Sequence, residues 1–147
     1  MSGRTNADVG WLLTSVTFVA LVGTVGSLYF SLGVGLTPCR LCWYQRILMY
    51  PLVVVGGVAA IEGRAGAWKT VLPLSVGGTA IAAYHVFLQI RPPAGASCGL
   101  GESCTAILYP MADGLLTIPR LSLVGFVLIT VLTLGVAAVA SDEETQS

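Results

Sequence analysis

Long uncharged runs alternate along the chain with short polar segments. The runs cover residues 9–38, 47–61, 70–90 and 121–141. A helix that crosses the hydrocarbon core of a bilayer needs roughly 20 apolar residues, so the first, third and fourth runs are long enough by themselves. The second run reaches this length when residues 43–46 join it, which places Arg46 at the membrane interface or facing the protein interior. The pattern predicts spans at residues 9–35, 43–61, 70–90 and 120–141.

The composition agrees with a protein that lies almost entirely in the membrane. Hydrophobic residues make up 55% of the 147 residues and charged residues only 10%, and the mean hydropathy is +0.86. In soluble domains, about a quarter of the residues are charged. We therefore expect one all-α membrane domain over residues 1–147, a four-helix bundle surrounded by lipid. The formal net charge is zero, and without a basic patch nucleic-acid binding has no electrostatic support.

All four cysteines fall into two of the predicted loops. Cys39 and Cys42 lie in residues 36–42, and Cys98 and Cys104 lie in the long loop at residues 91–119. With four spans, these two loops share one side of the membrane and both termini share the other. Disulfides persist in oxidising compartments and are rare in the cytosol. We therefore expect extracytoplasmic cysteine loops and cytoplasmic termini in the cell membrane, although the basic residues alone do not decide the orientation. Apolar residues at near-helical spacing predict one or two short helices on the membrane surface within residues 105–116.

The first cysteine pair has the spacing Cys-x-x-Cys, which is typical of dithiol–disulfide exchange or of metal binding. We expect the second helix to begin at or just after Cys42, where the helix dipole and nearby cations lower a thiol pKa. Arg46 lies one helical turn after Cys42, on the same face, where its charge can stabilise a Cys42 thiolate. Two alternatives are a static disulfide and a zinc site that uses all four cysteines.

The second pair encloses two glycines, Gly99 and Gly101, which make the segment from Cys98 to Cys104 flexible enough to close into a disulfide ring. An exposed, strained disulfide is comparatively oxidising and is open to attack by another protein's thiolate. The alternative is a ring that only staples the loop.

Further candidates lie near the cysteine side of the membrane. His85 sits late in the third span, and an ionisable residue there is a candidate functional group that can transfer protons. The alternative is a helix–helix hydrogen bond. Gln89, one turn further on, shares its face. Trp43 and Tyr44 are typical interface anchors, and flat aromatic side chains beside the cysteines can also border a ring-shaped ligand.

Several segments together resemble the DsbB family of membrane disulfide-generating oxidoreductases, and in particular its short BdbC-type members. They are PCRLCWYQR at residues 38–46, MYP at 49–51, YHVFLQ at 84–89, CGLGESC at 98–104 and LTIPRLS at 116–122. The resemblance extends from about residue 36 to residue 126. It implies a four-helix bundle that reoxidises a DsbA-like thioredoxin-fold protein outside the cytoplasm and passes the electrons to a membrane quinone, either ubiquinone or menaquinone.

The resemblance also implies a role for each site residue. The partner's thiolate attacks Cys98 to form a mixed disulfide, with Cys104 as the resolving cysteine. Electrons then reach Cys39, which exchanges with the second pair, and Cys42, whose thiolate faces the quinone. Arg46 is the cation of the quinone site, and His85 lies at or near that site.

Two other functions compete with this interpretation. A vitamin K epoxide reductase-like enzyme also combines a helical bundle with Cys-x-x-Cys and quinone chemistry, but its loop cysteines are expected before the Cys-x-x-Cys pair, and here they follow it. The other alternative is a non-enzymatic membrane scaffold stapled by two disulfides.

Overall fold

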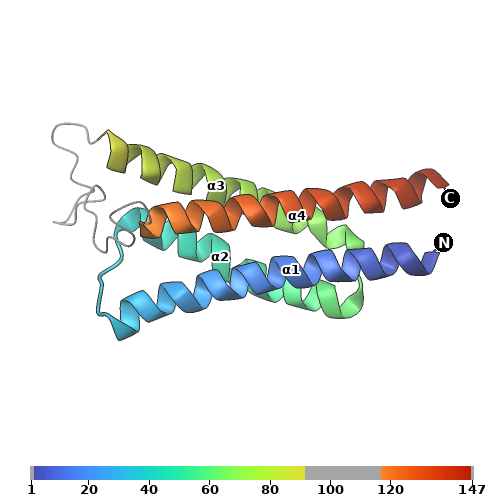
Figure 1. Ribbon diagram of the computed structural model, residues 1–147, viewed down its shortest axis with the longest axis horizontal. Coiled ribbons are helices and arrows are strands. Elements are labelled where there is room, and N and C mark those ends of the chain that lie inside the picture. Colours follow the sequence, from blue (N-terminus) through green and yellow to red (C-terminus); the bar gives the residue numbers. More distant parts are fainter. Residues whose placement is uncertain (1, 92–116, 147) are drawn as a thin grey trace.

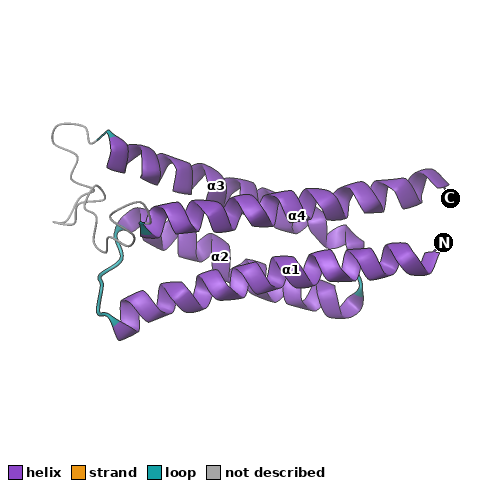
Figure 2. Ribbon diagram, viewed as in Figure 1, coloured by secondary structure: helices purple, strands orange, loops and turns teal. Residues whose placement is uncertain are grey.

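The computed structural model describes residues 2–91 and 117–146, and the regular secondary structure of this part of the chain is entirely helical, without strands (Figures 1 and 2). The predicted all-α fold is therefore confirmed. The predicted surface helices within residues 105–116 and the second cysteine pair lie outside the described residues. The helices are α1 (Ser2–Leu28), continued by the π-helical segment η1 (Tyr29–Gly33), then α2 (Arg40–Glu62), the short 3-10 helix η2 (Ala65–Ala67), α3 (Trp68–Ile90) and α4 (Ile118–Gln146).

The four long helices form an antiparallel bundle in which each helix packs against its neighbours in the chain, and α4 closes the bundle against α1 (Figure 1). The N- and C-terminal ends of the chain lie together at one end of the bundle. The α1–α2 connection lies at the opposite end, together with the end of α3 and the start of α4. The two connections predicted to share a side of the membrane therefore begin and end at the same end of the bundle.

All four helices are long and apolar enough to cross a membrane, over Ala7–Gly33, Arg40–Glu62, Ala65–Ile90 and Ile118–Asp142. Many large apolar side chains point outward, among them Phe18, Val54, Phe87 and Val131. So many exposed large apolar side chains are unfavourable in water and are expected on a protein that faces lipid. The predicted four-span membrane bundle is confirmed.

The core lies along the bundle axis and is built from closely packed apolar side chains. Val16, Leu52, Val71 and Phe126 are completely buried and belong to one cluster that joins all four helices. Several hydroxyl groups in the bundle bond within their own helix, as where the buried Thr133 donates to the carbonyl oxygen of Ile129 at 2.7 Å. Such local bonding is required where no water reaches the backbone.

Gly78 lets α3 approach α4 closely. A Cβ atom at this position would overlap the ring of Phe126, which is buried against it. Small residues at helix–helix contacts are the usual means of close packing in membranes.

We predict that Gly78→Ala lowers the free energy of unfolding by about 1–3 kcal/mol, because the added methyl group overpacks the α3–α4 contact. Thermal unfolding in detergent, followed by circular dichroism, measures the effect. Gly10→Ala is the matched control, since a Cβ atom there meets nothing within 4 Å. Equal unfolding temperatures for the two variants would contradict this account of the packing.

Candidate functional site

The first cysteine pair lies at the start of α2. The helix begins at Arg40, earlier than expected from the sequence, so Cys42 belongs to its first turn. Cys39 is the N-cap residue, with extended backbone at φ −65° and ψ 167°, and its carbonyl oxygen accepts the N–H of Trp43 at 3.1 Å. The preceding Pro38 disfavours helical backbone at Thr37, so the helix does not extend back toward η1.

This start places the two sulfur atoms on the same face of the first turn. The Sγ atoms of Cys39 and Cys42 lie 3.0 Å apart, and both of these described cysteines are free. The separation is well beyond the roughly 2.05 Å of a disulfide bond, so the pair is reduced. Because the sulfurs are already in contact, disulfide formation requires only a small movement of the side chains.

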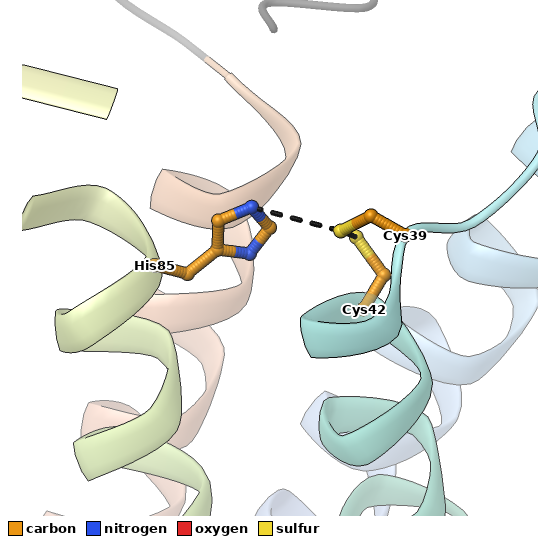
Figure 3. A group of neighbouring side chains, drawn as sticks. All are labelled: Cys39, Cys42 and His85. Atoms are coloured by element: carbon orange, nitrogen blue, oxygen red, sulfur yellow. Dashed lines mark hydrogen bonds between the residues drawn. The ribbon is translucent and has the colours of Figure 1, made fainter. Parts of the chain in front are cut away.

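His85 reaches the pair from the opposite helix. Its side chain extends from α3 toward Cys39, and the Nε2 atom lies 3.8 Å from the Cys39 Sγ atom (Figure 3). On the other side of the ring, the Nδ1 atom lies 3.3 Å from the side-chain nitrogen of Gln45. All three side chains are buried. His85 therefore lies at the cysteine end of the bundle, in contact with the Cys39 sulfur, while its functional role stays a prediction.

Gln45 is the site residue that sequence reasoning missed. It lies three positions after Cys42, on the same face of α2, and is buried with only 6% of its surface exposed. The available signal was its polarity inside a predicted span, since polar residues there usually face the bundle interior and mark functional sites.

The surroundings of Cys39 favour its thiolate form. A hydrogen bond from the Cys42 thiol lowers the pKa of Cys39 to about 4, with smaller contributions from His85 and from the backbone N–H of Cys42, while burial acts in the opposite direction. Near neutral pH the reduced pair therefore carries its first negative charge on Cys39, and Cys42 is the donor. The sequence led us to expect a thiolate at Cys42. In this geometry such a thiolate forms only when the Cys39 sulfur is bonded to another group.

A cavity of about 450 Å³ lies on the other side of Cys42, between α1, α2 and α4. Cys42, Gln45, Arg46 and Tyr50 contribute to its wall from α2, and the remaining lining is predominantly apolar. Among the described residues, Cys39 and His85 are not part of this wall. The two cysteines therefore have different surroundings. Cys39 faces His85 on α3, and Cys42 faces the cavity.

Arg46 is fixed at the cavity wall by contacts with the end of the first helix. Its Nη2 atom donates to the carbonyl oxygen of Ser27 at 3.0 Å and also to the hydroxyl oxygen of Ser31. The guanidinium group also lies over the ring of Trp43, 5.7 Å from the ring centre. The positive charge is thus held in place beside the same cavity as Cys42.

The other predicted site residues that the structure describes do not belong to the cavity wall. Trp43 and Tyr44 are about half exposed on the outside of α2 and are not among the described residues of the cavity wall, so their contact with a ligand stays a prediction. Gln89 accepts a hydrogen bond from the Thr117 hydroxyl at 3.1 Å, which joins the end of α3 to the start of α4. Cys98 and Cys104 lie outside the described residues.

A reduced Cys-x-x-Cys pair at a helix start, beside an apolar cavity in a membrane bundle, defines a membrane thiol–disulfide oxidoreductase. Residues 7–140 match the family model described as "Disulfide bond formation protein DsbB", and the chain belongs to this family. The fold and the resemblance stated from the sequence are therefore confirmed at the level of the family.

Curated relatives agree with this assignment. The chain is 42% identical to disulfide bond formation protein C of Bacillus subtilis (strain 168) over 116 residues, which cover 77% of this chain and 83% of the relative. It is 38% identical to a probable disulfide formation protein of Deinococcus radiodurans over 141 residues, covering 90% and 88% of the two chains. A probable disulfide formation protein of Metapseudomonas resinovorans is 34% identical over 126 residues, covering 83% and 87%. No solved structure matches the chain significantly.

We predict that the alkylation rate of reduced Cys39 stays near its plateau down to about pH 5 and falls only as the pH approaches 4, where the thiolate is protonated. Cys42→Ala removes the largest cause of the lowered pKa and shifts this profile to higher pH, and His85→Ala shifts it by a smaller amount. The measurement is iodoacetamide labelling against pH, with Cys98 and Cys104 replaced by serine. A wild-type profile with its midpoint above pH 8 would show that the two contacts do not stabilise the thiolate.

Proposed function

We propose that this protein is a quinone-dependent disulfide-generating oxidoreductase, which reoxidises a DsbA-like thioredoxin-fold protein outside the cytoplasm and passes the electrons to a membrane quinone. The observation that carries the proposal is the apolar cavity that contains Cys42 and Arg46 in its wall. When bound, a quinone supplies an acceptor for two electrons and two protons. The proposal accounts for why only one sulfur of the pair faces that cavity.

The cavity suits a quinone in size, chemistry and access. Its volume of about 450 Å³ lies within the range of roughly 300–1,000 Å³ that is usual for small-molecule sites. Apolar side chains fit the ring and an isoprenoid tail, and the Arg46 guanidinium can donate hydrogen bonds to a carbonyl oxygen. Lining residues such as Phe18, Val22 and Val124 are also exposed on the outer surface of the bundle, which favours entry from lipid.

The proposed cycle begins at the second cysteine pair. A thiolate of the reduced partner attacks Cys98, which breaks the Cys98–Cys104 disulfide and forms a mixed disulfide with the partner. The partner's second thiolate then breaks the mixed disulfide, so the partner leaves oxidised and the electron pair stays on Cys98 and Cys104. This exchange conserves the number of disulfides and needs no further oxidant.

The electron pair then passes to the first cysteine pair. Attack by a loop thiolate on the Cys39 sulfur breaks the Cys39–Cys42 disulfide and releases Cys42 as a thiolate. Because Cys39 is then engaged in a disulfide, Cys42 carries the negative charge at the cavity wall, where Arg46 favours it. The other loop thiolate then attacks the loop sulfur of this mixed disulfide, so that the Cys98–Cys104 disulfide forms again and Cys39 leaves as a thiolate. The reduced Cys39–Cys42 pair then gives up two electrons and two protons through Cys42, which a quinone in the cavity would accept, and the Cys39–Cys42 disulfide forms again.

His85 and Gln45 fit the proton transfers of this cycle. His85 contacts the Cys39 sulfur through Nε2 and the Gln45 side chain through Nδ1. Gln45 in turn lines the cavity. The family resemblance implies a place for His85 at or near the quinone site, and we propose that it exchanges protons with Cys39 while Gln45 connects it to the cavity.

We also propose that the protein lies in the cell membrane with the cysteine end of the bundle outside. The start of α2 and the ends of α3 and α4 that flank the second pair share one end of the bundle (Figure 1). A disulfide-generating site is useful in an oxidising compartment, and both termini are then cytoplasmic.

We predict that the purified protein oxidises a reduced thioredoxin-fold substrate only when a quinone is added, and that Cys98→Ser abolishes this activity. The assay compares ubiquinone and menaquinone analogues side by side in lipid vesicles and follows substrate thiols over time. Oxidation that is equally fast without a quinone would contradict the proposal. Full activity of Cys98→Ser would remove only the role assigned to Cys98.

We predict that Arg46→Ala raises the KM for quinone by roughly 10- to 100-fold, because the loss of a hydrogen bond from a charged group costs about 1.5–3 kcal/mol. Arg40→Ala is the matched control, since Arg40 lies on the same helix and is exposed. Steady-state kinetics with varied quinone and saturating substrate measure the effect. An unchanged KM in Arg46→Ala would place the quinone outside this cavity.

A further inference from the structure

Cys39, Cys42 and His85 together form a group of metal-ligand atoms. The two sulfur atoms and a ring nitrogen of His85 all lie within 4.8 Å of one another. Two of the three residues are buried, and Cys42 is partly exposed. They come from two helices, because the start of α2 supplies the sulfurs and α3 supplies the imidazole (Figure 3). The sequence alone suggested zinc only with all four cysteines as ligands, and the structure offers His85 instead.

The geometry is close to that of a zinc site. Two thiolates bound to one tetrahedral Zn²⁺ lie roughly 3.8 Å apart, and a thiolate and an imidazole nitrogen lie roughly 3.6 Å apart. The Cys39 sulfur lies 3.8 Å from the Nε2 atom of His85. The two sulfurs lie 3.0 Å apart, so they need to separate by less than about 1 Å, a change that side-chain rotation at the first turn of α2 can supply.

Gln45 can support the imidazole as a ligand. A histidine that binds metal through Nε2 keeps its proton on Nδ1 and donates it to a neighbouring acceptor. The amide of Gln45 lies against Nδ1 at 3.3 Å, and a half-turn of the amide exchanges its nitrogen for its oxygen. The side chain can therefore accept the Nδ1 proton, which leaves the Nε2 lone pair facing the sulfurs.

We propose that the reduced Cys39–Cys42 pair and His85 bind one Zn²⁺ ion, and that this ion holds the pair in its reduced state. Two Zn–S bonds and one Zn–N bond form as water ligands of the ion are displaced, and the thiol proton that the reduced pair still carries, on Cys42, is released to solvent. No electron is transferred. The fourth position of the ion remains for water or another donor.

Zinc binding at this site is linked to the redox state of the protein. In the disulfide form, both sulfurs are joined to each other and neither is a thiolate, so the strong ligands are lost. A ligand that binds only the reduced form stabilises that form by mass action. Zinc therefore opposes re-formation of the disulfide and inhibits turnover. The site itself depends on the thiols and the imidazole and not on the use of a quinone.

The test measures zinc bound to the full-length protein in detergent, in its reduced and oxidised forms. We expect one Zn²⁺ per reduced chain and none retained by the oxidised chain. Co²⁺ in place of zinc should give the sulfur-to-metal absorption and intense visible bands typical of a tetrahedral thiolate site. His85→Ala should weaken binding at least about tenfold, since even the loss of a residue behind a ligand costs 10- to 100-fold.

Matched variants distinguish this site from metal bound elsewhere on the chain. Tyr84→Ala alters the exposed neighbour of His85 and should bind zinc as the wild type does. The double variant Cys98→Ser with Cys104→Ser should also keep one ion, whereas loss of the ion there would assign it to the second cysteine pair and overturn the proposal. Equal zinc content in the reduced and oxidised forms would overturn it as well, and this comparison needs no variant. An unchanged zinc affinity of a His85→Ala protein that keeps its native helicity would also overturn the proposal.

Discussion

The start of α2 immediately after Cys39 is the constraint on which the rest of the site depends. Because Cys39 has extended backbone and caps the helix, the two cysteines lie across a single turn, with their sulfurs 3.0 Å apart. The same turn directs Cys39 toward His85 on α3 and Cys42 toward the cavity between α1, α2 and α4. One local feature of the backbone thus gives two chemically similar thiols different neighbours.

The membrane imposes the second constraint, because four antiparallel spans bring distant segments of the chain to one end of the bundle. His85 and Cys39 are 46 residues apart in sequence and in contact in the structure. Arg46 is held by the end of the first helix, through Ser27 and Ser31. His85 on α3 and Arg46, which is bonded to the end of the first helix, therefore lie on different sides of α2. In the proposed cycle, this arrangement separates exchange with a protein partner from electron transfer to a quinone.

The sequence predicted four helical spans, a common end of the bundle for the α1–α2 connection and the segments that flank the second cysteine pair, and the nearness of His85 to that end, because these follow from apolar run length and from parity. It did not predict the start of α2 at Arg40, since a cap depends on backbone angles at Cys39 rather than on apolar periodicity. The role of Gln45 and the cavity were also missed, because both depend on how three helices pack. The hydrogen bond that Cys42 donates to Cys39 is a property of side-chain geometry that spacing alone cannot give.

The central claim is that electrons leave the protein from Cys42 into the cavity between α1, α2 and α4. A photoreactive quinone analogue tests this most directly, with the labelled peptides identified by mass spectrometry after illumination of the reconstituted protein. The account predicts labels within residues 18–31 and 42–50, with competition by unlabelled quinone. Labels concentrated on α3 around His85, with none on α1, would contradict it.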